Sequence, residues 1–163
     1  MRPEVRSFDY INHPYERVRD ALREDANDIF RAATTAATSR ASSVASELRV
    51  SLGAIEVTAE IDIAIHEIED LAQTQGASRG TRIRLEWRGA QRPGLFPLMH
   101  ADLSIYPLTS TETQLDFEGT YRPPLGPLGR AIDALVGHRI AEASVHRFVA
   151  DVAQHLRDKL STD

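Results

Sequence analysis

Six histidines are the side chains of this sequence best suited to metal binding or proton transfer, and their spacing favours neither use. Paired metal ligands on one helix typically stand three or four residues apart, whereas the last three histidines here are separated by eight and nine. His66-Glu67 begins like a zinc-protease motif, but the second histidine is missing. We therefore expect no metal and no cofactor. The histidines are His13, His66, His100, His138, His146 and His155.

Catalytic nucleophiles and phosphate-binding loops are equally hard to find. The absence of cysteine excludes disulfides, Cys-ligated zinc, iron–sulfur clusters and thiol catalysis. The run from Gly76 to Gly80 lacks the Lys-Ser/Thr of a P-loop, and Pro127 removes an amide that a phosphate would need in the run from Gly126 to Gly129. No Gly-x-Ser-x-Gly elbow occurs. We assign no catalytic residue from these patterns. His100, on the polar face of its strand by alternation, would become a general base only if a register shift turned it inward.

The charge of the chain argues against a dedicated nucleic-acid binder. Nineteen basic residues against 24 acidic ones give a net charge of −5, whereas such binders are normally basic. One local cluster of arginines stands out, and we expect it to form cross-strand ion pairs on a solvated face of the sheet, with partners such as Glu60, Asp62, Asp116 and Glu118. The cluster consists of Arg79, Arg82, Arg84, Arg88 and Arg92.

Length and hydropathy predict one domain spanning residues 1–163. A chain of 163 residues with 42% apolar residues can bury a sizeable core. No apolar run approaches the ~18 residues of a membrane span, and the start Met1-Arg2-Pro3-Glu4 does not resemble a signal peptide. We expect a cytoplasmic protein without integral membrane association.

Alternation of apolar and polar residues predicts a mostly antiparallel sheet. A helix starts at Pro14 and keeps an apolar stripe to Ala33, while Thr34–Ser46 is rich in Ala, Ser and Thr and reads either as a frayed helical extension or as a loop. A second, long helix runs from Gly126 to about Leu160, with a bend expected at Gly137-His138, where its apolar face shifts. The expected strands are 5–11, 48–52, 57–66, 82–88, 99–106 and 114–121.

These elements predict a cavity. The apolar face of the sheet must be covered, and the long C-terminal helix is the element available to cover it. One helix of ~10 Å diameter cannot fill the concavity of a strongly curved sheet of six or seven strands. Large side chains fill the remaining space, or it stays open as a pocket between helix and sheet.

The stretch Leu115–Asp133 (LDFEGTYRPPLGPLGRAID) resembles the last strand, the Pro/Gly corner and the start of the final helix in the START-like, or SRPBCC, superfamily. That group includes polyketide cyclase/dehydrase-like proteins, the birch-pollen allergen family, lipid-transfer START domains and coenzyme Q-binding proteins. The element order is similar over essentially the whole chain, except that Thr34–Ser46 departs from the usual second short helix. The resemblance implies an α+β helix-grip fold, with a curved antiparallel sheet of about six or seven strands around a long C-terminal helix. It also implies an apolar or aromatic small-molecule ligand, although a superfamily does not fix a function.

Inward-facing positions of the predicted sheet and final helix are the candidate ligand contacts, although for each residue taken alone plain core is the favoured interpretation. Trp87 and Tyr121 also need a partner for N–H or O–H when buried, which a ligand or a cavity water could supply. The candidates are Ile63, Ile65, Leu85, Trp87, Met99, Leu103, Phe117, Tyr121 and Phe148.

Three functions remain open at this point. The first is a non-enzymatic binder or carrier of a hydrophobic small molecule. The second is an enzyme of the polyketide cyclase or aromatase type, in which Tyr121, Trp87 or an inward histidine transfers protons. The third is a ligand-free interaction module or homodimer, for which the apolar residues 95–98 are a candidate contact; the same residues could instead form a loop at the cavity mouth.

Overall fold

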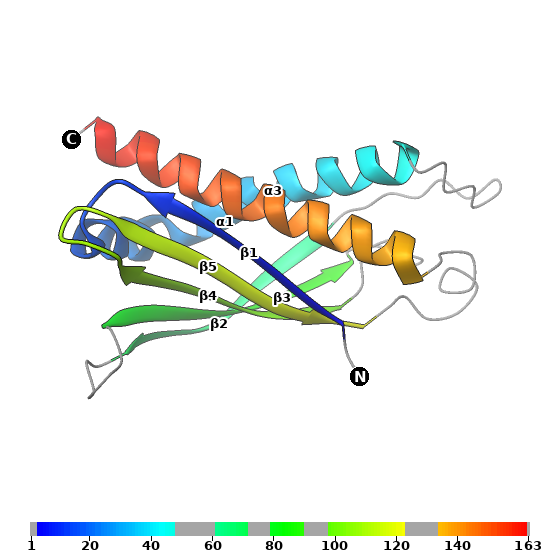
Figure 1. Ribbon diagram of the computed structural model, residues 1–163, viewed down its shortest axis with the longest axis horizontal. Coiled ribbons are helices and arrows are strands. Elements are labelled where there is room, and N and C mark those ends of the chain that lie inside the picture. Colours follow the sequence, from blue (N-terminus) through cyan, green and yellow to red (C-terminus); the bar gives the residue numbers. More distant parts are fainter. Residues whose placement is uncertain (1–2, 48–60, 72–78, 90–97, 123–133, 163) are drawn as a thin grey trace.

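A computed structural model describes residues 3–47, 61–71, 79–89, 98–122 and 134–162, and shows a five-stranded antiparallel sheet with two long helices on one of its faces (Figure 1). The helices are α1 (Tyr15–Glu47) and α3 (Ala134–Ser161). The strands are β1 (Glu4–Ile11), β2 (Ile61–Leu71), β3 (Gly80–Gly89), β4 (Met99–Pro107) and β5 (Thr113–Tyr121).

The sheet has the order β1-β5-β4-β3-β2, so the first strand of the chain pairs with the last one. Strands β2 to β5 form the expected meander, and the α+β helix-grip arrangement is confirmed. The described part of the chain holds five strands, fewer than the six or seven expected. The strand expected at 48–52 and the beginning of the one expected at 57–66 lie outside the described residues.

Helix α1 extends to Glu47, so Thr34–Ser46 is a helical extension and the loop interpretation is wrong. Alanine has the best helix propensity, and its small side chain allows neighbouring helices to pack closely. Ala33, Ala37 and Ala41 are completely buried, at the four-residue spacing of one helix face. The helix is kinked at Asp25, whose backbone angles are φ −120° and ψ 22°, and Lys159 from α3 forms ion pairs with Asp25 and the neighbouring Glu24.

Helix α3 runs through Gly137 and His138 as one helix, so the bend expected there is wrong. Its buried face from Ile140 onward consists of residues such as Val145, Phe148 and Leu156. Leu128 and Ile132, which carried much of the expected shift in the apolar face, lie outside the described residues. No helix within the described ranges is long and apolar enough to cross a membrane.

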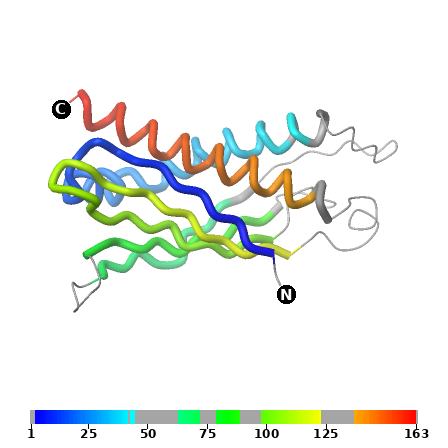
Figure 2. Tube along the Cα trace, in the orientation of Figure 1, coloured from blue at the N-terminus to red at the C-terminus, as the bar shows by residue number. Residues whose placement is uncertain are grey.

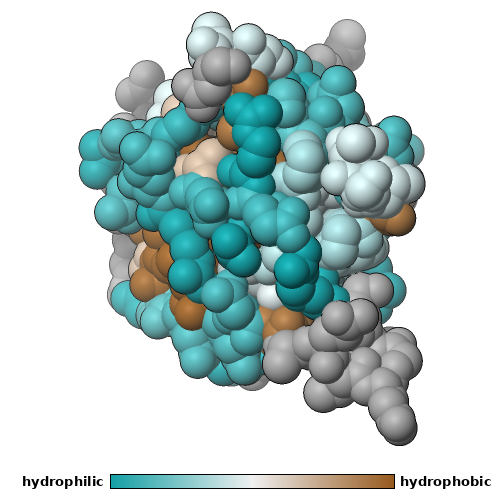
Figure 3. All heavy atoms as spheres, turned by 90° about the vertical axis from the view of Figure 1, so that its left-hand side faces the viewer, coloured by the Kyte–Doolittle hydropathy of each residue, from teal (hydrophilic) through white to brown (hydrophobic). Residues whose placement is uncertain are grey.

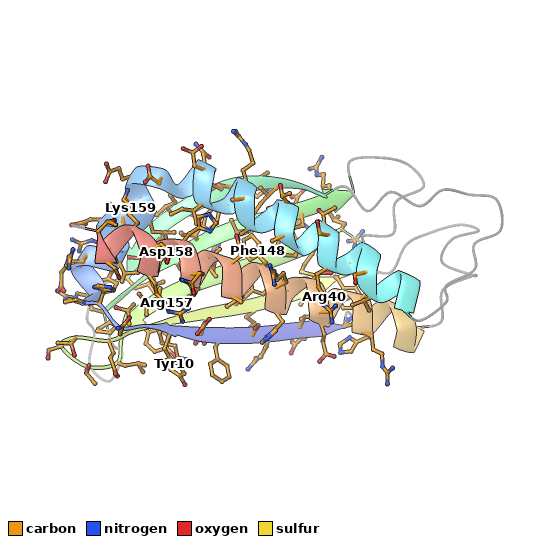
Figure 4. The ribbon with its side chains drawn as sticks, turned by 90° about the horizontal axis from the view of Figure 1, so that it is seen from above. Tyr10, Arg40, Phe148, Arg157, Asp158 and Lys159 are labelled. Atoms are coloured by element: carbon orange, nitrogen blue, oxygen red, sulfur yellow. The ribbon has the colours of Figure 1, made fainter. Side chains whose placement is uncertain are left out.

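Two helices rather than one cover the sheet. The second half of α1 lies beside α3, and both run across the same face (Figures 2 and 4). The sequence argument for a large cavity counted only the C-terminal helix, so it overestimated the space that remains to be filled. At the end of the molecule where α3 finishes, hydrophilic side chains dominate and hydrophobic ones form small separate groups (Figure 3).

Four aromatic rings fill the middle of the layer between helices and sheet. Phe148 of α3 packs edge-to-face on Trp87 of β3, with ring centroids 4.7 Å apart. Phe117 of β5 lies 5.6 Å from Trp87 and 5.9 Å from Phe148, and Phe30 of α1 stacks on Phe148 at 5.9 Å. We call these four residues the aromatic cluster. Because its members come from both helices and from two strands, the cluster fixes how the two layers lie on each other.

Small residues in the sheet make room for this packing. Gly119 on β5 pairs with Ala101 on β4, and both face the helices. A Cβ atom on Gly119 would lie 2.9 Å from Phe117 Cε1 and 3.1 Å from Met99 Sδ, which is closer than carbon and sulfur atoms pack.

We predict that Gly119→Ala lowers the free energy of unfolding by about 1–3 kcal/mol, because Phe117 or Met99 must move out of its packed position. Urea unfolding followed by circular dichroism measures this change. Thr120→Ala, on the opposite face of the same strand, is the matched control and should change stability by less than about 1 kcal/mol. Equal stability of wild type and Gly119→Ala would show that the inner face is not tightly packed at this point.

Candidate functional site

The register of the strands places four of the predicted ligand contacts in one row across the inner face of the sheet. Ile63 on β2 lies opposite Trp87 on β3, Trp87 lies opposite Met99 on β4, and Met99 lies opposite Tyr121 on β5. We call these four residues the end row, because they lie near the end of the sheet where α1 finishes and α3 begins (Figure 1). Trp87, Met99 and Tyr121 are buried, whereas Ile63 on the edge strand is only partly buried.

The other predicted contacts lie deeper along the same face. Ile65 and Leu85 belong to the neighbouring row, which Ala101 and Gly119 continue. Leu103 and Phe117 pair in the row after that, and Phe148 descends from α3 onto Trp87 and Phe117. The structure thus places all nine predicted residues in the layer between helices and sheet. Three of the nine, Trp87, Phe117 and Phe148, also belong to the aromatic cluster.

A polar pair, which the sequence analysis missed, lies at the Tyr121 end of the end row. The Tyr121 hydroxyl is 2.8 Å from His138 Nδ1 in the first turns of α3, and the two rings stack with centroids 6.0 Å apart. Tyr121 is only 4% exposed. One turn further along α3, Glu142 Oε1 lies 3.8 Å from His138 Nε2. A buried hydroxyl is therefore connected through an imidazole to a surface carboxylate.

The surroundings of Tyr121 keep its hydroxyl protonated. Burial raises the pKa of Tyr121, because the phenolate would lose its hydration, and the negative charge of Glu142 raises this pKa further. With the imidazole proton on Nε2, on the side of Glu142, the Tyr121 hydroxyl donates to His138 Nδ1; with the proton on Nδ1, His138 donates to the Tyr121 oxygen.

One sequence signal could have revealed this pair. A search for metal sites compares the spacing of histidines with one another and overlooks carboxylates. His138 and Glu142 stand four residues apart on one helix, a spacing that brings two side chains together. The contact between Tyr121 and His138 leaves no such trace, because the Pro/Gly corner separates the two residues in the sequence. The sequence indicated that a buried Tyr121 needs a partner, and the structure supplies one in His138.

The polar outer face of the sheet accounts for two other histidines. His66 Nε2 and His100 Nδ1 lie 3.0 Å and 3.7 Å from Oε2 of Glu86, and Arg88 contacts the other oxygen of this carboxylate, Oε1. His66 sits within β2 rather than at its end, at a β-bulge between Ile65 and Glu67. Arg88, and less strongly His66, lowers the pKa of Glu86 against the opposing effect of burial. His100 points outward, as its alternation predicts.

The described members of the arginine cluster form ion pairs between neighbouring strands, along β3 and, for Arg79, with α1. The carboxylates come from α1, β2, β3 and β4, which differ from the partners that we expected. The pairs are Arg79 with Glu16, Arg82 with Glu69, Arg84 with Glu67 and Asp102, and Arg88 with Glu86. Arg92 and residues 95–97 lie outside the described residues. Within the described part of the chain no group of His, Asp and Glu side chains has the arrangement of a metal site.

Comparison of the sequence with known protein families and with curated proteins gives no match. Among solved structures, TTHA0849 from Thermus thermophilus is similar over 99% of both chains, with 16% identity and a TM-score of 0.53. A conserved protein from Geobacillus kaustophilus is similar over 94% of both chains, with 12% identity and a TM-score of 0.51. The match with the Zhui aromatase/cyclase from Streptomyces sp. R1128 extends over 98% of this chain and 96% of the other chain, with 12% identity and a TM-score of 0.47. At these identities the first two likenesses support a shared fold and nothing finer.

We predict that stability declines at high pH partly through two tyrosines. Burial and Asp116 raise the pKa of Tyr106 to about 12, and burial raises that of Tyr121. When the pKa of a tyrosine is higher in the folded state than in the unfolded state, the protonated hydroxyl stabilises the fold. This stabilisation is complete below the unfolded pKa of about 10 and is lost as the pH rises through the folded pKa. Urea unfolding at pH 8 and pH 11 should therefore show a smaller loss of stability in Tyr106→Phe and Tyr121→Phe than in wild type. An unchanged loss in both variants would contradict the assignment.

Proposed function

We propose that this protein binds an apolar or aromatic small molecule against the end row, beneath the first turns of α3. The observation that carries the proposal is the contact between the buried Tyr121 and the partly exposed His138 at one end of an otherwise apolar row. Ligand sites in proteins are mostly apolar, with a few polar groups that fix the orientation of the ligand. Membership of the START-like superfamily, suggested by the corner at Leu115–Asp133, fits the same proposal.

The aromatic cluster limits where such a ligand can lie. Phe30, Phe117 and Phe148 occupy the middle of the layer between helices and sheet, and Trp87 belongs both to this cluster and to the end row. A ligand that contacts Trp87 therefore lies on the side of its ring away from the middle, toward Met99 and Tyr121. Leu103 and Phe117, two rows further along the sheet, then pack behind the residues that contact the ligand and do not contact it themselves.

The edge strand supports this placement. Ile63 and Ile65 face the inside of the sheet but remain partly exposed, although they pack against the core. Covering the remaining apolar surface of these two side chains with a ligand is favourable at about 25 cal/mol per Å². An uncharged molecule gains this energy without having to bury a charge.

A cyclase- or aromatase-like enzyme is the second candidate, and the Tyr121–His138 pair also favours it. An acid–base pair in the wall of an apolar site can position a reactive chain and move its protons. A homodimer stays a prediction, because most of the apolar segment 95–98 lies outside the described residues. Proton transfer and binding use the same two side chains, so binding is the function to test first.

The test uses Trp87, the single tryptophan of the chain, as its reporter. N-phenyl-1-naphthylamine is an uncharged apolar dye that absorbs where tryptophan emits. We expect saturable quenching of Trp87 emission, together with a rise in dye emission, at a stoichiometry of one dye per chain.

Two neighbouring variants separate specific binding from surface adsorption. Ile63→Glu places a carboxylate beside the proposed site and should weaken dye binding by about ten-fold or more, because the charge loses hydration when the dye covers it. Ala64→Glu places the same charge on the exposed outer face and should bind the dye as wild type does. Dye binding that is non-saturable, or equally strong in both variants, would exclude the end row as the binding site.

A further inference from the structure

The two edge strands of the sheet differ in how they are protected against pairing with a further strand. β2 carries charged residues such as Glu67 and has a β-bulge after Ile65, and both features discourage such pairing. β1 pairs with β5 in a continuous register, and its outer side carries Phe8 and Tyr10, which are 58% and 49% exposed. In the described part of the chain no strand lies beyond β1. The edge of β1 is therefore the one that needs another kind of protection.

We propose that the free edge of β1 is a self-association surface that fits β1 of a second copy of this chain, and that the ion pair between Asp9 and Arg157 of α3 keeps this edge closed. The proposal does not depend on the proposed ligand, because it concerns the edge of the sheet and not the layer between sheet and helices. A second copy is the occupant because the strand is complementary to itself in charge and in side-chain type.

The hydrogen-bond pattern determines which backbone groups of β1 face outward. The Tyr121 N–H donates to the Pro3 carbonyl at 3.1 Å, so these two residues form a hydrogen-bonded pair of the antiparallel ladder. Bonded and non-bonded pairs alternate along such a ladder, and every second residue from Pro3 onward therefore bonds to β5. The residues between them direct N–H and C=O toward the free edge. These edge residues are Glu4, Arg6, Phe8 and Tyr10.

Tyr10 is the edge residue whose two backbone groups are both occupied by side chains of its own chain. Its N–H donates to Asp9 Oδ1 at 2.7 Å, and its carbonyl oxygen accepts a hydrogen bond from Arg157 Nη2. The same Arg157 nitrogen lies 2.8 Å from Asp9 Oδ1, so one ion pair covers both groups. The side chains of Asp9 and Arg157 are only 29% and 30% exposed, and Figure 4 shows Arg157 between α3 and β1. An approaching strand therefore meets the Tyr10 end of the edge already bonded.

Charge and side-chain type select one register for two copies of β1. Antiparallel pairing about a two-fold axis at Phe8 places Phe8 opposite the partner's Phe8, and Arg6 opposite the partner's Tyr10. All of these are edge residues, so their backbone groups can bond across the axis. Two facing aromatic rings, and a guanidinium beside a tyrosine ring, are favourable cross-strand pairs. An axis at Asp9 would instead set two carboxylates opposite each other, which is unfavourable.

The ion pair blocks this register, because Tyr10 cannot exchange hydrogen bonds with the partner's Arg6 while Asp9 and Arg157 occupy its backbone groups. A register that avoids Tyr10, with its axis at Ser7, bonds only Arg6 with Phe8 across the axis. Two bonded residue pairs are too few for a stable pair of strands. We therefore expect a monomeric wild type that associates through β1 once the ion pair is removed.

Sedimentation velocity over a range of concentrations tests this expectation. Arg157→Ala frees the Tyr10 carbonyl and should lower the dissociation constant of the dimer by about ten-fold or more, since each copy gains backbone hydrogen bonds. Asp9→Ala frees the Tyr10 N–H and should also promote dimerisation, so the test does not depend on one variant. Arg147→Ala removes the same charge from an exposed position of α3 and should behave as wild type.

Two further measurements locate the contact. Phe8→Pro, added to Arg157→Ala, removes an edge N–H and no bond to β5, and it should restore the monomer. Amide hydrogen exchange should show the Arg6 and Phe8 amides exchanging freely in wild type and protected in the Arg157→Ala dimer.

Three results would overturn the proposal. If Arg157→Ala and Asp9→Ala both stay as monomeric as wild type, the edge of β1 is not a self-association surface. Wild type that dimerises as tightly as Arg157→Ala would show that the ion pair does not close the edge. A dimer that survives Phe8→Pro, with the Arg6 and Phe8 amides still exchanging freely, would place the contact elsewhere on the molecule. None of these results bears on ligand binding at the end row.

Discussion

The contact between Phe148 and Trp87 is the constraint on which the arrangement of the layers depends. Their rings meet edge-to-face at 4.7 Å, and Phe30 and Phe117 extend the contact to α1 and β5. Aromatic residues bury more area than other side chains and prefer defined relative orientations, so one such cluster can fix the height and direction of both helices. Gly119 is required by this packing, because Phe117 and Met99 occupy the space that a side chain at position 119 would need.

The candidate site follows from this packing. Since the cluster fills the middle of the layer, the proposed ligand is assigned to the end row rather than to the centre of the sheet. Helix α3 begins at the same end, and this places His138 above Tyr121. The same strand and helix therefore also bring a hydroxyl, an imidazole and a carboxylate together at one end of the layer.

Much of the fold could be predicted from the sequence, because period-two alternation identifies both the strands and their inner faces. It assigned Ile63 and Met99 inward and His100 outward. The sequence left Thr34–Ser46 open between a helical extension and a loop, because alanines were not counted as an apolar stripe although they pack as one between close helices. The Tyr121–His138 contact could not be predicted, because it depends on how the last strand and the final helix lie in space. The alternation of residues along a strand predicts which face a side chain lies on, but it does not predict which residue of another element the side chain contacts.

The most direct measurement is a crystal structure of the protein with 2-methylnaphthalene, which tests the position of the apolar ligand. The account predicts density for one molecule beneath the first turns of α3, in contact with Ile63, Met99 and Tyr121, with the aromatic cluster unmoved. Density elsewhere on the protein, with the end row covered by the chain's own side chains, would contradict the central claim.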